Sequence, residues 1–183
     1  SSILMVSDNL NSQLKNLARN KKRSSNYYNS LIKKNEIQFK WVKKFDEFYP
    51  ILIKNKKKHK AKPTHSIKEL DKLKKILPDE ILQLMIYSKK NPIGGMTVFK
   101  ITEKSIVLFY SMFDYTYQHL QPITLLMQYI ISWAKKNEIQ FIDYGISNQP
   151  KAKEKLSLNI SLIKFKEDFG CFSSIRNTYR KSL

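Results

Sequence analysis

Three residues near the C-terminus have types and a spacing that could place chemistry in a cleft. Asn159 is followed seven positions later by Lys166 and eleven positions later by Gly170. The carboxylate of Glu167, next to Lys166, could act as a general base or pair in a salt bridge. The run lies in a predicted unit of strand, helix, strand and helix: 105–114, 122–137, 141–147 and 158–169.

Two further ionisable residues occur where a solvated surface residue is not expected. Asp143 interrupts the apolar strand FIDYGIS, and a carboxylate there must be paired, lie at the cleft or be exposed at the strand end. His65 stands in the loop KPTHS, where it could contact a substrate or act as a base. For both residues a purely structural role is the alternative.

A phosphate-binding end is expected at the start of helix 122–137. Pro122 occupies the first helical position, where a proline is well tolerated. The free N–H groups and the positive dipole end of such a helix attract phosphate. The segment that leads to it supplies the candidate donor-binding residues Tyr115, Gln118 and Gln121. An ordinary helix start is the alternative.

The other elements predict a single domain with a mixed sheet and flanking helices. Strands of a meander over residues 81–114 pair antiparallel, and the helical crossover makes strand 141–147 parallel to strand 105–114. If these two strands splay apart, a V-shaped opening forms between them, which Tyr110 and Tyr144 could line. We expect residues 1–35 to be helical, and residues 171–179 to form a closing strand.

The composition limits the class of protein. The chain has 183 residues, of which 42% are hydrophobic, and this suits one domain with a substantial core. The net charge of +19 raises the alternative of a nucleic-acid-binding module that uses the lysine clusters 15–23 and 54–62. Only 4 of the 34 basic residues are arginines, however, and arginine is the residue preferred for bidentate base and phosphate recognition.

Several other classes of site are not supported by the sequence. One cysteine, Cys171, allows no disulfide within the chain, and the three histidines are scattered, so we predict no metal site. No apolar run is long enough for a transmembrane span, and no signal peptide is recognisable. We therefore expect a cytoplasmic protein, with peripheral membrane association left open.

The order of landmarks resembles the GNAT acyltransferase superfamily over Leu10 to Tyr179. The stretches KPTHSIKEL, PIGG, FIDYGIS and FKEDFGC resemble a narrower branch, the Fem-type peptidoglycan aminoacyltransferases and related GNAT-like acyltransferases. Fem-type proteins resemble two GNAT units in tandem, and this chain resembles the second. The resemblance implies one GNAT-like domain, which could be the second unit of a larger protein.

The resemblance also implies roles for individual residues. The pair Phe165-Lys166 resembles the Fem-type Phe-Lys pair, whose lysine is thought to stabilise charge at the reacting carbonyl. Lys166 stands seven residues after Asn159, at the position where typical GNAT enzymes carry a tyrosine. The alternative for Lys166 is a surface lysine on an amphipathic helix.

The expected reaction is transfer of an acyl or aminoacyl group from an activated carrier to an amine. The implied donor is acyl-CoA, an acyl-carrier protein or an aminoacyl-tRNA, with no permanently bound cofactor. The glycine-rich pyrophosphate loop of acyl-CoA members is absent from segment 118–123, so tight binding of CoA is not expected. The acceptor implied by the family is a cell-envelope sugar or peptide amine. A nucleic-acid-binding module and a degenerate, non-catalytic GNAT scaffold are the alternatives.

Overall fold

The computed structural model describes residues 1–6, 25–149 and 157–175. A seven-stranded sheet forms its centre, in the order β2-β3-β4-β5-β6-β1-β7. Its strands are β1 (Ser2–Met5), β2 (Ile37–Val42), β3 (Ile81–Ser88), β4 (Asn91–Thr102), β5 (Ser105–Phe113), β6 (Phe141–Asp143) and β7 (Phe172–Ser173). Its helices are α2 (Ser25–Lys34), α3 (Phe48–Lys58), α4 (Ile67–Ile76), the 3-10 helix η1 (Tyr115–Leu120), α5 (Pro122–Lys136) and α6 (Ile160–Glu167).

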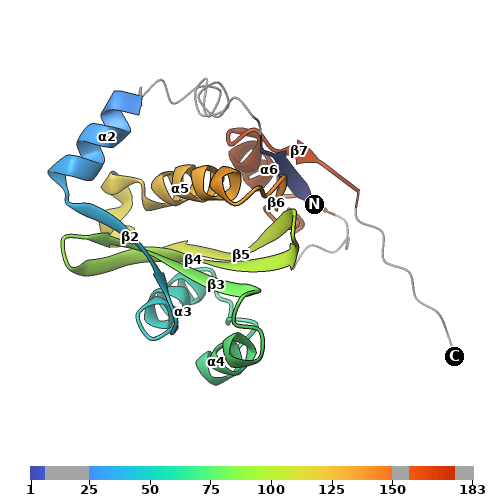
Figure 1. The fold of residues 1–183 in the computed structure, drawn as a ribbon, viewed down its shortest axis with the longest axis horizontal. Coiled ribbons are helices and arrows are strands. Elements are labelled where there is room, and N and C mark those ends of the chain that lie inside the picture. Colours follow the sequence, from blue (N-terminus) through green and yellow to red (C-terminus); the bar gives the residue numbers. More distant parts are fainter. Residues whose placement is uncertain (7–24, 150–156, 176–183) are drawn as a thin grey trace, which may run out of the picture.

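The sheet separates two apolar cores. Helices α3 and α4 cover one face over β3, β4 and β5, where Phe45, Phe48 and Leu52 are fully buried. Helices α2, α5 and α6 pack on the other face, where the side chains of Leu126 and Ile130 from α5 are fully buried (Figure 1). The mixed, mostly antiparallel sheet with one parallel pair confirms the predicted fold class.

Local sequence signals account for several of these elements. Ser66 caps α4, and its hydroxyl and backbone exchange hydrogen bonds with Glu69, which completes a capping box. Gly95 lies where a side chain has no room, because an added Cβ would meet the Leu84 carbonyl oxygen at 2.8 Å and the Phe48 ring at 2.8 Å. The glycine pair thus permits the close backbone approach that the sequence predicts.

The N-terminal part of the sheet differs from the prediction. Residues 2–5 form β1 between β6 and β7, a strand that the sequence analysis missed inside its expected helical segment 1–35. The apolar run ILMV is short, and only its pairing with distant strands makes it extended. Of that helical segment, residues 7–24 lie outside the described residues. The closing strand is also shorter than expected: β7 covers Phe172–Ser173, and residues 176–179 lie outside the described part.

Candidate functional site

The parallel pair of the sheet, β5 and β6, separates partway along β5. The two strands pair at three positions only: Ser105 with Phe141, Ile106 with Ile142, and Val107 with Asp143. Strand β5 continues for six residues, 108–113, beyond the last pair. Tyr144, the residue after the last pair, bonds instead to β1, the other neighbour of β6. Its backbone N–H donates to the Ser2 carbonyl over 2.8 Å. The strands therefore diverge at one end, as predicted.

A β-bulge in β5 lies just where this divergence begins. Thr97 of β4 pairs with Tyr110, and Val98 pairs with Leu108, so Phe109 is the extra residue of β5. Bulges bend a strand and redirect its side chains, and they are common next to active sites. Within the described residues, no other strand pairs with β5 on its β6 side beyond Val107, so this backbone edge can bond to a ligand.

Helix η1 and the start of α5 follow the open end of β5. Asp114 caps η1 by accepting from the Thr116 backbone N–H over 3.0 Å. Gln121 joins η1 to α5 in the left-handed conformation, with φ of 52°, and its side chain does not cap α5. Instead its Oε1 accepts from the Tyr28 hydroxyl over 3.3 Å, while Gln118 is exposed. The N-terminal turn of α5 therefore has no side-chain cap from its N-cap residue.

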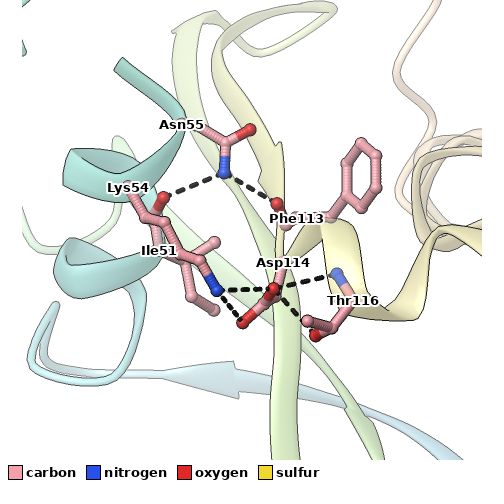
Figure 2. Close-up of polar contacts among 6 residues, drawn as sticks. All are labelled: Ile51, Lys54, Asn55, Phe113, Asp114 and Thr116. Atoms are coloured by element: carbon pink, nitrogen blue, oxygen red, sulfur yellow. Dashed lines mark hydrogen bonds and ion pairs between the residues drawn. The ribbon is translucent and has the colours of Figure 1, made fainter. Parts of the chain in front are cut away.

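A polar anchor ties α3 to the end of β5 (Figure 2). The buried Asn55 amide donates to the carbonyls of Ile51, within α3, and of Phe113, the last residue of β5, over 2.9 and 2.7 Å. Beside it, Lys54 Nζ lies 2.9 Å from a carboxylate oxygen of Asp114. Because both contacts bridge the two elements, the end of the open strand is fixed against the last turns of α3.

The last turns of α3 carry a basic cluster that reaches Tyr115. Lys58 Nζ lies 3.4 Å from the centre of the Tyr115 ring, and His59 Nε2 lies 3.3 Å from its hydroxyl oxygen. Lys56 lies over Tyr110, 5.7 Å from the ring centre. This is the described lysine cluster, 54–62; the other cluster, 15–23, lies outside the described residues. Positive charge therefore collects beside the start of η1, where the chain leaves β5.

Lys166 is buried and holds the chain segment that follows β6. Only 4% of the residue is exposed. Its Nζ donates to the carbonyl oxygens of Gly145 and Ile146 and to Ser147 Oγ, over 2.7, 3.0 and 2.9 Å. Burial lowers the pKa of Lys166, which the nearby Cys171 and Asp143 partly oppose. The alternative of a surface lysine is therefore wrong.

Asp143 and Tyr144 lie at the end of β6, near Lys166. The carboxylate of Asp143 accepts from Ser1 Oγ over 2.5 Å and from the Gly145 backbone N–H over 2.7 Å. The Tyr144 side chain is 7% exposed and lies in the core on the α5 side of the sheet. Its hydroxyl has no hydrogen-bond partner in the described structure. Burial, with a smaller contribution from Cys171, raises the pKa of Tyr144 well above its ordinary value.

The other three predicted residues near Lys166 belong to α6 or to its N-cap. Asn159 caps α6, with its Oδ1 accepting from the Leu162 backbone N–H over 3.0 Å, so the predicted donor-binding residue has a structural role here. Phe165 is half-buried against Phe169, with the ring centres 5.1 Å apart. Glu167 is exposed at the end of α6.

His65 and Tyr110 lie on the opposite face of the sheet, with α3 and α4. The Tyr110 hydroxyl accepts from the Thr64 backbone N–H over 3.0 Å, and only 3% of Tyr110 is exposed. The His65 ring is half-buried against Phe109, the bulge residue, with ring centres 5.5 Å apart. Its Nδ1 is buried without a partner.

The predicted residues thus form three groups around the open end of β5. Asp143, Tyr144 and Lys166 gather at the end of β6, and His65 and Tyr110 lie across the sheet. Tyr115, Gln118 and Gln121 lie at η1. Ser147 was not among the predicted residues, because a serine in a polar loop carries no distinguishing signal until Lys166 is placed beside it.

Comparison with solved structures places this domain among GNAT-like acyltransferase folds. The FemX structure aligns with a TM-score of 0.71 at 10% identity, over 93% of this chain and 58% of FemX. An aminoglycoside acetyltransferase, meta-AAC0020 from an uncultured soil metagenomic sample, aligns with a TM-score of 0.55 at 12% identity, over 83% of this chain and 99% of its own. A possible acetyltransferase from Clostridium difficile 630 aligns at 0.57 and 15% identity, over 80% and 97%.

The sequence narrows this class further. The profile of the FemAB family matches residues 1–174, and the chain belongs to that family. It spans 58% of the length of FemX. A comparison with curated protein sequences finds no match. The family and the fold confirm the predicted GNAT-like, Fem-type resemblance, and they do not favour a separate nucleic-acid-binding module. In the described residues, no helix is both long and apolar enough to cross a membrane.

Proposed function

We propose that this domain catalyses transfer of an acyl or aminoacyl group to an amine in the opening between β5 and β6. The observation that carries the proposal is that this parallel pair ends at Val107 and Asp143 while β5 continues. The donor carbonyl bonds to the free β5 edge, and the amine nitrogen attacks the carbonyl carbon. The carrier leaves with the electron pair of the broken bond, and the amide is the product.

Lys166 supplies positive charge where negative charge develops on the carbonyl oxygen. Among the described residues, it is the one buried charged side chain. A preorganised cation in a site that excludes water is effective at this task. Its three hydrogen bonds fix the 145–147 segment as one wall of the opening. Phe165, beside it on α6, is proposed to contact the donor.

A base must take the proton from the attacking amine. His65 is our first candidate, because its ring packs on Phe109 at the bulge and its Nδ1 has no partner. Asp143 and Glu167 are the other candidates. Asp143 already accepts two hydrogen bonds, and Glu167 is exposed. Either carboxylate would therefore take the proton through a bound water or directly from the acceptor amine.

The carrier is proposed to be an aminoacyl-tRNA rather than CoA or an acyl-carrier protein. Residues 118–123 hold no glycine, and the turn at Gln121 therefore lacks the open backbone that a pyrophosphate loop needs. The 54–62 cluster and the ring of Tyr115 lie together at the start of η1, the 3-10 helix that leads to this turn. Lysines and an aromatic ring are the groups with which proteins contact phosphates and bases of single-stranded RNA.

The acceptor is proposed to be an amine of a cell-envelope sugar or peptide, because the chain belongs to the FemAB family. Such an acceptor would approach from the α3–α4 side, where His65 lies. A cytoplasmic protein that meets its acceptor at the membrane surface would fit this role.

A donor screen tests the proposed function. Radiolabelled aminoacyl-tRNA pools and acyl-CoA thioesters are each incubated with amine-bearing envelope precursors, and labelled product is separated by chromatography. We expect transfer from aminoacyl-tRNA and a KM that rises when Lys57 and Lys58 are replaced by glutamine. Two matched lysines on α4, Lys68 and Lys72, serve as the control, since they lie in another exposed helix. No transfer from any donor would contradict the proposal.

A further inference from the structure

We infer that the hydroxyl of Tyr144 donates the proton that the departing carrier needs. The inference rests on the proposed acyl transfer and names the general acid of that reaction. It is carried by the position of Tyr144 at the divergence of the parallel strands, and by the isolation of its hydroxyl inside the protein.

The first observation is that the Tyr144 hydroxyl is buried without a hydrogen-bond partner. Only two side-chain polar atoms of the described residues share this condition, and the other is His65 Nδ1. Buried hydroxyl groups in proteins nearly always find a partner, because leaving one unpaired costs free energy. Phenylalanine would fill the same space without that cost. The hydroxyl is therefore best explained by a partner that arrives with the substrate.

The second observation is where this hydroxyl belongs in the fold. Tyr144 is the first residue after the last β5–β6 pair, so it begins the wall that faces the open edge of β5. The same wall, residues 145–147, is fixed by Lys166. A donor whose carbonyl bonds to β5 presents its leaving atom toward the opposite wall. The hydroxyl lies in the core on the α5 side of the sheet, and a donor that enters between β5 and this wall has to reach it there.

The third observation concerns the state of the phenol. Burial raises the pKa of Tyr144, so the group keeps its proton at neutral pH and acts as a donor rather than as a base. An acid works best when its strength is matched to the group it protonates. A weakly acidic phenol is better matched to the alkoxide released from an ester than to a thiolate. The assignment thus favours an ester-linked acyl donor.

In the transfer step, the amine nitrogen bonds to the carbonyl carbon, and the bond from that carbon to the carrier oxygen breaks. The electron pair stays on the carrier oxygen, which takes the Tyr144 proton and leaves as an alcohol. The proton that the amine nitrogen gives up returns to the phenolate through the base and water, so Tyr144 ends as it began.

Tyr144→Phe tests the inference, because it removes only the oxygen. Transfer is measured with two donors that carry the same acyl group, one a ribose ester and one a p-nitrophenyl ester. We expect kcat for the ribose ester to fall by about 100-fold. The p-nitrophenyl ester needs no acid to leave, and its kcat is expected to fall by less than about fivefold. The melting temperature should be unchanged or higher, since no hydrogen bond is lost.

Tyr87→Phe is the matched control. Tyr87 is also buried, but it lies on β3 outside the proposed site and its hydroxyl donates to the Glu47 carboxylate, so this variant should melt at a lower temperature and show no difference between the two donors. The inference is overturned if Tyr144→Phe keeps kcat within twofold for the ribose ester, or if both donors are slowed equally. A clearly lower melting temperature with unchanged kcat would show a structural water bond instead. Failure of the wild-type chain to use either donor contradicts the proposed function, and the inference falls with it.

Discussion

The Nζ of Lys166 donates a hydrogen bond to Ser147 Oγ over 2.9 Å, which joins α6 to the chain just past β6. The same ammonium also donates to the carbonyls of Gly145 and Ile146, so all three of its protons are used. If residues 145–147 form one wall of the proposed site, Lys166 sets both the shape and the charge of that site. Stability and turnover should therefore change together when Lys166 is altered.

Lys166→Met is expected to lower both properties. The side chain keeps its length but leaves two partly buried carbonyls and the buried Ser147 hydroxyl without their Lys166 donor. We expect the free energy of unfolding to fall by about 2 kcal/mol or more. Loss of the oxyanion-stabilising charge is expected to lower kcat by about 100-fold. Urea denaturation and steady-state kinetics measure the two effects.

Lys166→Arg separates charge from geometry. The guanidinium keeps the positive charge but is planar and larger, and it cannot make the same three bonds. We expect partial activity at best. If Lys166→Met folds with wild-type stability and turns over at the wild-type rate, both the structural and the catalytic assignments of Lys166 are wrong.

Cys171 should make stability depend on alkaline pH. Its thiol is 7% exposed, and burial raises its pKa to about 12, although Lys166 opposes the shift. The unfolded thiol titrates near its ordinary value of about 8.5. Since the folded pKa is the higher one, the unfolded state loses its proton first as the pH rises. This contribution is therefore present in full below about pH 8.5 and is lost between there and about pH 12.

Denaturation at a series of pH values between 7 and 10.5 checks this dependence. Cys171→Ala should lose stability more slowly than wild type over the upper part of this range. At pH 8 the folded wild-type thiol should also react far more slowly with a thiol reagent than the urea-unfolded chain does. Equal reaction rates in the two states would refute the assignment of Cys171 as a buried thiol.

The sequence was sufficient to predict the structure where local rules decide it. The proline at the start of α5 and the parallel pairing of β5 with β6 were both predicted, because each depends on residue order or on neighbouring residues.

The sequence was insufficient to predict the structure where contacts between distant parts of the chain decide it. Strand β1 forms because Ile3 pairs with both Asp143 and Phe172, more than 100 positions away, and nothing in ILMV requires those partners. The burial of Lys166 likewise depends on a wall built from residues 145–147. The spacing from Asn159 located this lysine, but it could not show whether the side chain pointed into the protein.

Asn55 is expected to matter far more to folding than its neighbour Lys54. Asn55→Ala removes a buried amide that bonds to the Ile51 and Phe113 carbonyls, and we expect a loss of about 1–3 kcal/mol. The Lys54 side chain is 58% exposed, and its ion pair with Asp114 is screened by solvent, so Lys54→Ala should cost about 0.5 kcal/mol or less. Urea denaturation of both variants gives the comparison, and equal losses would contradict it.

Free acetyl-CoA is expected to bind weakly at the η1–α5 junction. Tight pyrophosphate binding needs backbone N–H groups that a ligand can approach closely, which glycine allows and side chains prevent. Here residues 118–123 carry a side chain at every position, and Gln121 is in the left-handed conformation beside Pro122. The positive helix end and the net charge of +19 still attract the phosphates, so we expect a Kd above about 100 μM, or weaker than about −5.5 kcal/mol. Calorimetric titration at low and moderate salt measures this affinity, and the weak binding should fade as salt is added because it depends on exposed charge. A submicromolar Kd that resists salt would show that this junction accommodates CoA without glycines, and a thioester would then replace the RNA ester as the proposed donor.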